Sequence, residues 1–107
     1  MVLETSEDVP SPDNVARWLR NYGMQGVFDR AAAIMIGRAR GYFGERTREL
    51  DETVLRIIGD EFGARDLPVV TNLDFGHTDP QWILPLGCLA EVDPAAGEFR
   101  LVESPLR

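Results

Sequence analysis

Short apolar runs alternate with amphipathic helical patterns along this chain, and this alternation restricts the fold more than any other feature. The apolar runs lie at Val2–Leu3, 31–36 and 67–73; the first resembles the end of a strand, and the other two have strand length. Helical patterns occupy 12–22 and 47–62 between them. Such alternation is typical of a parallel sheet with right-handed crossovers. We therefore predict an α/β fold with a mainly parallel sheet and two crossover helices.

Each helical pattern carries signals for its start, its buried face and its end. Ser11 fits an N-cap before Pro12. The first helix has apolar residues at helical spacing, which predicts that all four lie in the core or at an interface: Val15, Trp18, Leu19 and Tyr22. The second helix has its own buried face: Leu50, Val54, Ile57, Ile58 and Phe62. Gly23 and Gly63 are expected to end the two helices.

Two further strands are expected at 83–92 and 98–102, joined by a turn at 93–97. Together they predict a C-terminal antiparallel hairpin. Cys88 falls inside the first of these apolar strands, so we expect its thiol to be buried and unreactive. The chain of 107 residues has the size of one small domain, 1–107.

The composition excludes several classes of partner. A formal net charge of -7 argues against nucleic acid and anionic membranes, because both attract a basic surface. No apolar run approaches the roughly 20 residues that span a bilayer. One cysteine fits a reducing compartment, so we expect a cytoplasmic protein. No cofactor is expected. No secretion leader precedes Val2–Leu3, and the abrupt start suggests a chain that is cut at its first strand.

The only histidine, His77, lies in the loop after the third predicted strand. Gly76 permits a backbone angle that turns the imidazole out of the strand direction. The carboxyl ends of parallel strands meet at one edge of a sheet, so Glu4, after the first strand, is a candidate neighbour. A carboxylate bonded to one ring nitrogen fixes the tautomer and makes the other more basic. We expect Glu4, or else Glu7, to lie within about 3 Å of a His77 ring nitrogen.

Two other kinds of site are weaker interpretations of the same region. Asp74, His77 and Asp79 could supply metal ligands, but one histidine without a cysteine cluster is a poor set, and no metal is expected. Arg38 and Arg40 could bind a carboxylate or a phosphate, although two neighbouring arginines are more often simply solvated.

Several motifs resemble the C-terminal domain of the S66 serine peptidases, over nearly the whole chain. They are residues 2–7 (VLETSE), 26–28 (GVF), 36–38 (IGR) and 72–80 (NLDFGHTDP). This family contains the LD-carboxypeptidases (muramoyltetrapeptide carboxypeptidases) and the microcin C immunity proteins. The resemblance implies a Ser-Glu-His triad whose serine lies in an N-terminal domain that is absent here. His77 matches the family's histidine and Glu4 its glutamate, with Glu7 as the alternative.

The resemblance implies a serine carboxypeptidase that hydrolyses an amide bond next to a free carboxylate. The substrate is murein tetrapeptide in one branch and an aminoacyl or peptidyl nucleotide in the other, and residues 37–44 are closer to the second. None of the three serines, Ser6, Ser11 and Ser104, lies in a glycine-flanked turn that would expose a nucleophile. We therefore expect a fragment of the catalytic unit that is inactive alone. The alternative is a non-catalytic binding or assembly module that pairs with a separate nucleophile-bearing chain.

An apolar surface is expected beside His77. Phe75, Trp82 and Ile83 lie near it in the sequence, and the domain would lack the neighbour that covers this face. We therefore expect the chain to form a homodimer or a higher oligomer, or to be marginally stable alone. Trp82 then lies either at that contact or inside its own chain beneath the hairpin.

Overall fold

A three-stranded parallel sheet with two crossover connections forms the body of the molecule. The computed structural model describes residues 1–106. The sheet has the order β1-β2-β3, and its strands are Val2–Leu3, Ile34–Gly37 and Val69–Leu73. The helix α1 (Pro12–Met24) connects β1 to β2, and α2 (Glu45–Leu55) with the π-helix η1 (Arg56–Glu61) connects β2 to β3. The predicted α/β fold is confirmed.

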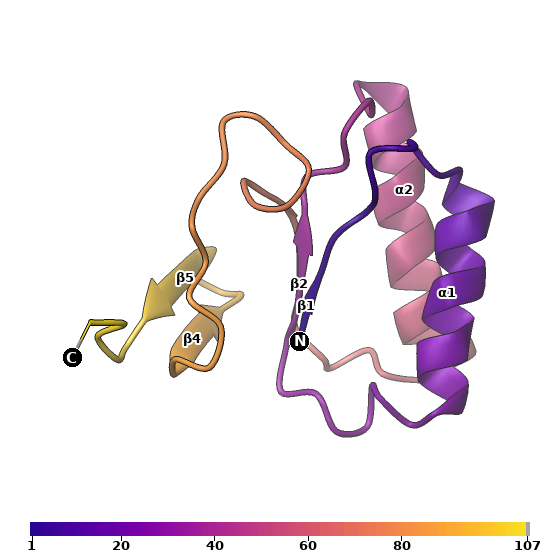
Figure 1. Cartoon of the computed structure of the whole chain (residues 1–107). Coiled ribbons are helices and arrows are strands. Elements are labelled where there is room, and N and C mark those ends of the chain that lie inside the picture. The colour runs from indigo at the N-terminus through magenta and orange to yellow at the C-terminus, as the bar shows by residue number, and fades with distance from the viewer. Residues whose placement is uncertain (107) are drawn as a thin grey trace.

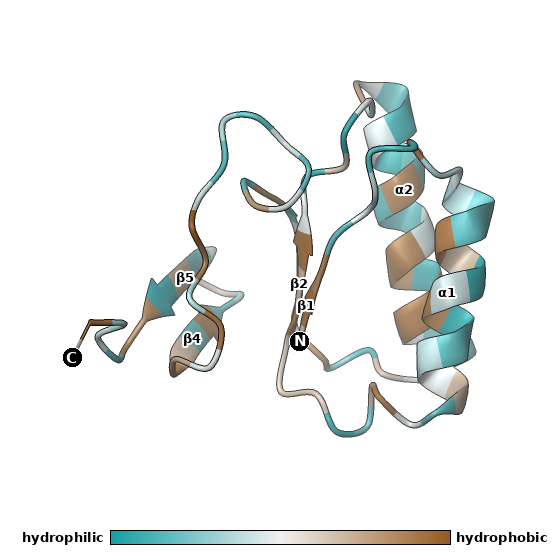
Figure 2. Cartoon of the chain, in the orientation of Figure 1, coloured by the Kyte–Doolittle hydropathy of each residue, from teal (hydrophilic) through white to brown (hydrophobic). Residues whose placement is uncertain are grey.

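Both helices lie on one side of the sheet, and the hairpin lies on the other (Figure 1). Apolar residues gather on β1, on β2 and on the parts of the helices that face the sheet or each other (Figure 2). The side chains of Ile34, Val54, Ile57 and Ile58 are fully buried there. No helix among residues 1–106 combines the length and the apolar character needed to cross a bilayer.

The central strand β2 is buried along its whole length, as the apolar run predicts. It begins at Ile34 rather than at residue 31, because residues 27–31 close a turn in which the Ala31 N–H donates to the Val27 carbonyl at 3.1 Å. Pairing starts where the Ile34 N–H donates to the Pro68 carbonyl at 2.8 Å. β3 likewise begins two residues later than predicted, at Val69.

The exposed positions of Trp18 and Tyr22 correct the predicted face of α1. The buried residues of this helix are Val15, Ala16 and Leu19, whereas Trp18 is 45% and Tyr22 37% exposed. β1 is an edge strand of only two residues, so the sheet does not extend far enough to cover the outer positions of the helix. The prediction that both aromatic residues lie in the core is wrong, and their placement at an interface stays a prediction.

The role of Gly23 also differs from the prediction. The helix α1 continues through Met24, and the chain reverses at Gly26, whose φ is +70°. A side chain at Gly23 would collide with the ring of Phe62. Phe62 in turn packs edge-on against Phe28, with ring centroids 5.6 Å apart. Gly23 therefore allows α1 to approach the end of η1 closely rather than ending the helix.

The second helical pattern forms two elements rather than one continuous helix. α2 begins at Glu45, and from Arg56 the chain continues as η1. The Phe62 N–H donates to the Ile57 carbonyl, five residues earlier, at 3.2 Å, which is the π-helical pattern. Side-chain spacing over so few residues does not distinguish this wider turn from an α-helix. Gly63 follows with a φ of +70° and ends the helix as predicted.

The C-terminal hairpin is confirmed, but its first strand is shorter than predicted. β4 (Ala90–Asp93) pairs antiparallel with β5 (Glu98–Leu101). Residues 81–89 form no strand, because Pro85 has no N–H to donate and Gly87 takes a φ of +87°. Cys88 therefore lies outside the strand and is half-buried, so the prediction of a fully buried thiol is wrong.

Candidate active site

A carboxylate and the only imidazole of the chain meet at the carboxyl edge of the sheet. Glu4 directly follows β1, and His77 lies in the loop after β3. The His77 Nδ1 atom lies 3.0 Å from Oε2 of Glu4, and each side chain is about half exposed. The predicted hydrogen bond is therefore present. Within residues 1–106, Glu4 is the one carboxylate bonded to His77, and Glu7 is not.

The loop after β3 folds over the end of β2, which lets His77 reach a residue that follows β1. The ring of Phe75 is buried and anchors this loop, so the prediction that Phe75 contributes to an exposed apolar surface is wrong. Gly37 at the end of β2 permits that anchoring, since a Cβ there would lie 2.5 Å from the Phe75 carbonyl oxygen and 3.1 Å from the ring. The Arg38 N–H also donates to the Leu73 carbonyl at 2.7 Å. The site is thus built on the sheet, although its side chains lie in loops.

Gly76 is required at its position for two independent reasons. Its φ of +85° lies in the region that residues with a side chain rarely adopt. In addition, a Cβ at this position would collide with the carboxylate oxygen of Glu4 and lie 2.8 Å from the Glu4 Cβ. The missing side chain therefore makes room for the carboxylate that bonds to His77.

Gly76→Ala should disrupt the pair, and Gly87→Ala should not. Gly87 has nearly the same φ, +87°, but a Cβ there meets nothing within 4 Å. Backbone strain should lower the unfolding free energy of both variants by about 1–3 kcal/mol. Gly76→Ala should also displace Glu4, so that the neutral imidazole no longer carries its proton on Nδ1 alone. Nitrogen-15 NMR of the single histidine reports this tautomer, and identical ring spectra for the two variants would contradict the prediction.

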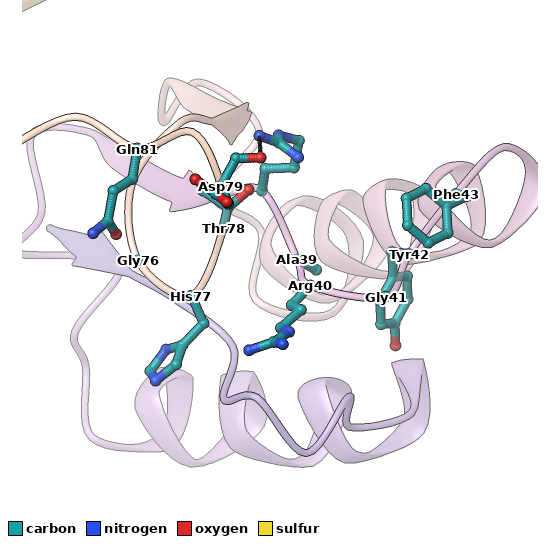
Figure 3. A pocket seen from close by; sticks show the side chains of 11 residues that line it. Ala39, Arg40, Gly41, Tyr42, Phe43, Gly76, His77, Thr78, Asp79 and Gln81 are labelled. Atoms are coloured by element: carbon teal, nitrogen blue, oxygen red, sulfur yellow. Dashed lines mark hydrogen bonds between the residues drawn. The ribbon is translucent and has the colours of Figure 1, made fainter.

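A cavity of about 540 Å³ opens beside His77 (Figure 3). Its walls come from the loop after β2 and the loop after β3, and its lining residues are Arg38, Ala39, Arg40, Gly41, Tyr42, Phe43, Gly76, His77, Thr78, Asp79 and Gln81. Arg38, from the loop after β2, forms contacts with the loop after β3. Its Nε atom lies 2.9 Å from Oδ1 of Asp74, and its Nη2 atom donates to the Asp79 carbonyl at 3.4 Å.

A second set of contacts fixes the loop after β2 against the segment that carries Glu4. The hydroxyl of Tyr42 donates to the Pro10 carbonyl, and burial raises the pKa of this tyrosine, so it stays a donor. Val9 takes a φ of +52°, unusual for a β-branched residue, and packs on Gly41, where a Cβ would lie 2.9 Å from it. Glu4 therefore lies between β1 and the segment Val9–Pro10, which contacts the cavity wall at Gly41 and Tyr42.

The described residues place no nucleophile at His77. Ser11 caps α1 by accepting from the Asn14 N–H at 3.3 Å, as predicted, and Ser104 donates to the Leu106 carbonyl at 2.9 Å. No serine, threonine or cysteine among residues 1–106 forms a hydrogen bond with His77. The same residues contain no group of three His, Cys, Asp or Glu side chains arranged to hold a metal, and Asp74 pairs with Arg38 instead.

The sequence patterns did not reveal the cavity or the difference between its two arginines. Arg38 is bound to Asp74, whereas Arg40 lines the cavity with an exposed side chain. The available signal was the glycine-rich segment 37–44, because glycines permit the close approaches at Gly37 and Gly41. It could not indicate which arginine meets an acidic partner, since that partner lies 36 residues away.

The fold and the site define a parallel α/β domain that presents a carboxylate-oriented histidine at the carboxyl ends of its strands. The model of the LD-carboxypeptidase C-terminal domain of the S66 peptidases matches residues 1–92. The chain belongs to this family, which confirms the resemblance seen in its motifs.

Two curated relatives carry names of the same kind. A candidate carboxypeptidase of Synechocystis sp. is 32% identical over 100 residues, which covers 91% of this chain and 32% of the relative. A candidate carboxypeptidase of Vibrio cholerae is 25% identical over 100 residues, covering 94% of this chain and 29% of the relative. The chain thus spans about a third of the length of each relative.

Proposed function

We propose that this domain supplies the glutamate and the histidine of a Ser-Glu-His triad in a cytoplasmic serine carboxypeptidase. The enzyme hydrolyses an amide bond next to a free carboxylate. The observation that carries the proposal is the contact of 3.0 Å between Glu4 Oε2 and His77 Nδ1. It leaves Nε2 of His77 for the nucleophile, and membership of the S66 family supports the reaction class.

The geometry supports a separate role for each of the two residues. The Glu4 carboxylate accepts a hydrogen bond from the N–H at Nδ1 of His77, so the neutral imidazole has its lone pair on Nε2. Nε2 removes the proton of the serine hydroxyl as the serine oxygen attacks the amide carbon. The same proton then goes to the leaving amine as the carbon–nitrogen bond breaks. A water molecule, activated by the same nitrogen, releases the acid product and the serine.

The serine comes from a nucleophile-bearing domain outside residues 1–106. The relatives are about three times as long as this chain, which leaves ample length for such a domain. An apolar surface beside the site suits its docking, because Trp82 is 48% and Ile83 97% exposed. The placement of Trp82 inside its own chain is therefore wrong, whereas a contact through this surface, with that domain or in a homodimer, stays a prediction.

The two branches of the family suggest two candidate substrates. Murein tetrapeptide, cleaved at the L,D-bond before its terminal D-alanine, is the first candidate. A peptidyl or aminoacyl nucleotide is the second, supported by the resemblance of residues 37–44 to that branch of the family. Both carry an anionic group close to the bond that is cleaved.

A chimera tests the proposal directly. The matching segment of the Synechocystis relative is replaced with this chain, and release of D-alanine from murein tetrapeptide is measured beside cleavage of a peptidyl nucleotide. We expect the chimera to turn over one of the two and the isolated chain to give background only, because a base without a nucleophile does not cleave amides. The control is the isolated chain with its three serines and Cys88 replaced by alanine. Turnover by this variant would contradict the proposal.

The second candidate function is a non-catalytic module that pairs with a separate nucleophile-bearing chain. The exposed Trp82 and Ile83 favour it, since a module needs only a docking surface. The same chimera separates the two functions. A module would support turnover that does not depend on His77, whereas the triad requires this residue.

A further inference from the structure

The two arginines of the cavity wall have different surroundings. Arg38 is neutralised by Asp74 and hydrogen-bonded to the backbone of the opposite loop. Arg40 is exposed, and within residues 1–106 it forms no ion pair. It lines the same cavity as His77, and in Figure 3 both side chains extend from their loops toward the same side. The cavity therefore has one cation without a partner beside the imidazole.

The backbone that carries Arg40 is held on both sides. Ala39 before it is 6% exposed, and Tyr42 after it is 5% exposed and bonded to the Pro10 carbonyl. Between them Gly41, with a φ of +73°, contacts Val9. A guanidinium on such a fixed loop loses less freedom when a ligand binds than one on a mobile loop.

We propose that Arg40 binds the free carboxylate of the substrate next to the amide that is cleaved. This inference rests on the proposed function and names the residue that selects for a free carboxyl end. The planar guanidinium offers two parallel N–H groups that match the two oxygens of a carboxylate. Because Arg40 and His77 line the same cavity, a substrate whose carboxylate binds Arg40 can present the neighbouring amide to the triad.

A carboxylate fits this wall better than a phosphate does. Phosphate sites usually combine several cations or use a helix N-terminus. Here Arg38 is already neutralised, and α2, which begins at the end of this loop, carries Glu45 in its first turn. That negative charge weakens the helix N-terminus as an anion site. Asp79, the one carboxylate among the lining residues, also disfavours a dianion.

The experiment uses the 107-residue chain itself, with N-acetyl-L-alanyl-D-alanine as the probe and its C-terminal amide as the matched ligand. Binding is followed by NMR shifts of the His77 ring, the only imidazole in the chain. We expect weak, saturable binding of the free acid and none of the amide. Arg40→Gln should weaken this binding about tenfold, the value of one charge-assisted contact at an open site. Arg40→Lys should retain part of it.

Arg48→Gln is the charge-matched control. Arg48 is exposed on α2 and lines no wall of this cavity, so its loss changes the net charge equally and should leave binding unchanged. Equal losses in the two variants, equal binding of acid and amide, tighter binding of inorganic phosphate than of the acid, or no binding at all would each overturn the inference. Binding needs no turnover, so its failure is distinct from an inactive chimera.

Discussion

His77→Ala should lower the kcat of the chimera by at least about two to four orders of magnitude, the range that a positioned general base contributes. The imidazole is the single base that the described residues bring to the site, and no other histidine exists in the chain to replace it. The KM for the tetrapeptide should change little, because His77 acts on the proton of the nucleophile and not on the ground state of the substrate.

Glu4 and Glu7 provide a matched pair for the same experiment. Glu4→Gln removes the charge that holds the proton on Nδ1, so kcat should fall by about a hundredfold or more. Glu7→Gln removes an exposed carboxylate of the same segment without touching His77 and should leave kcat unchanged. Equal effects of the two substitutions, or full activity of His77→Ala in a folded chimera, would refute the assignment of the base and its orienter.

Ile57→Ala should destabilise the domain more than any surface substitution. Ile57 is 0% exposed and lies in η1, within the cluster of buried residues that joins both helices to the sheet. Removing its three outer carbons leaves a cavity, and such substitutions cost about 2–5 kcal/mol of unfolding free energy. A small domain has a total of only about 5–15 kcal/mol, so part of the population should unfold.

Leu55→Ala is the control for this prediction, because Leu55 is 56% exposed at the end of α2. It should change the unfolding free energy by no more than about 0.5 kcal/mol. Ile57→Val keeps the variant folded and should cost about 0.5–1.5 kcal/mol. Urea unfolding followed by circular dichroism measures all three variants. Similar midpoints for Ile57→Ala and Leu55→Ala would show that the core is not centred where the structure places it.

The chain order of the elements and the meeting of Glu4 with His77 could be predicted from the sequence. Both follow from local patterns: apolar runs of strand length alternate with helical spacing, and parallel strands bring their carboxyl ends to one edge. Gly76 and Ser11 act as predicted because φ preference and capping depend on a few neighbouring residues.

The remaining features depend on contacts between residues that are distant in the chain. Trp18 and Tyr22 have helical spacing suited to burial, but a two-residue edge strand leaves them uncovered. Gly23 serves packing against Phe62, 39 positions further along, and its position near a helix end suggested another role. Arg38 and Arg40 are equivalent in the sequence. Only the fold of the loop after β3 brings Asp74 into an ion pair with Arg38, while Arg40 lines the cavity beside His77.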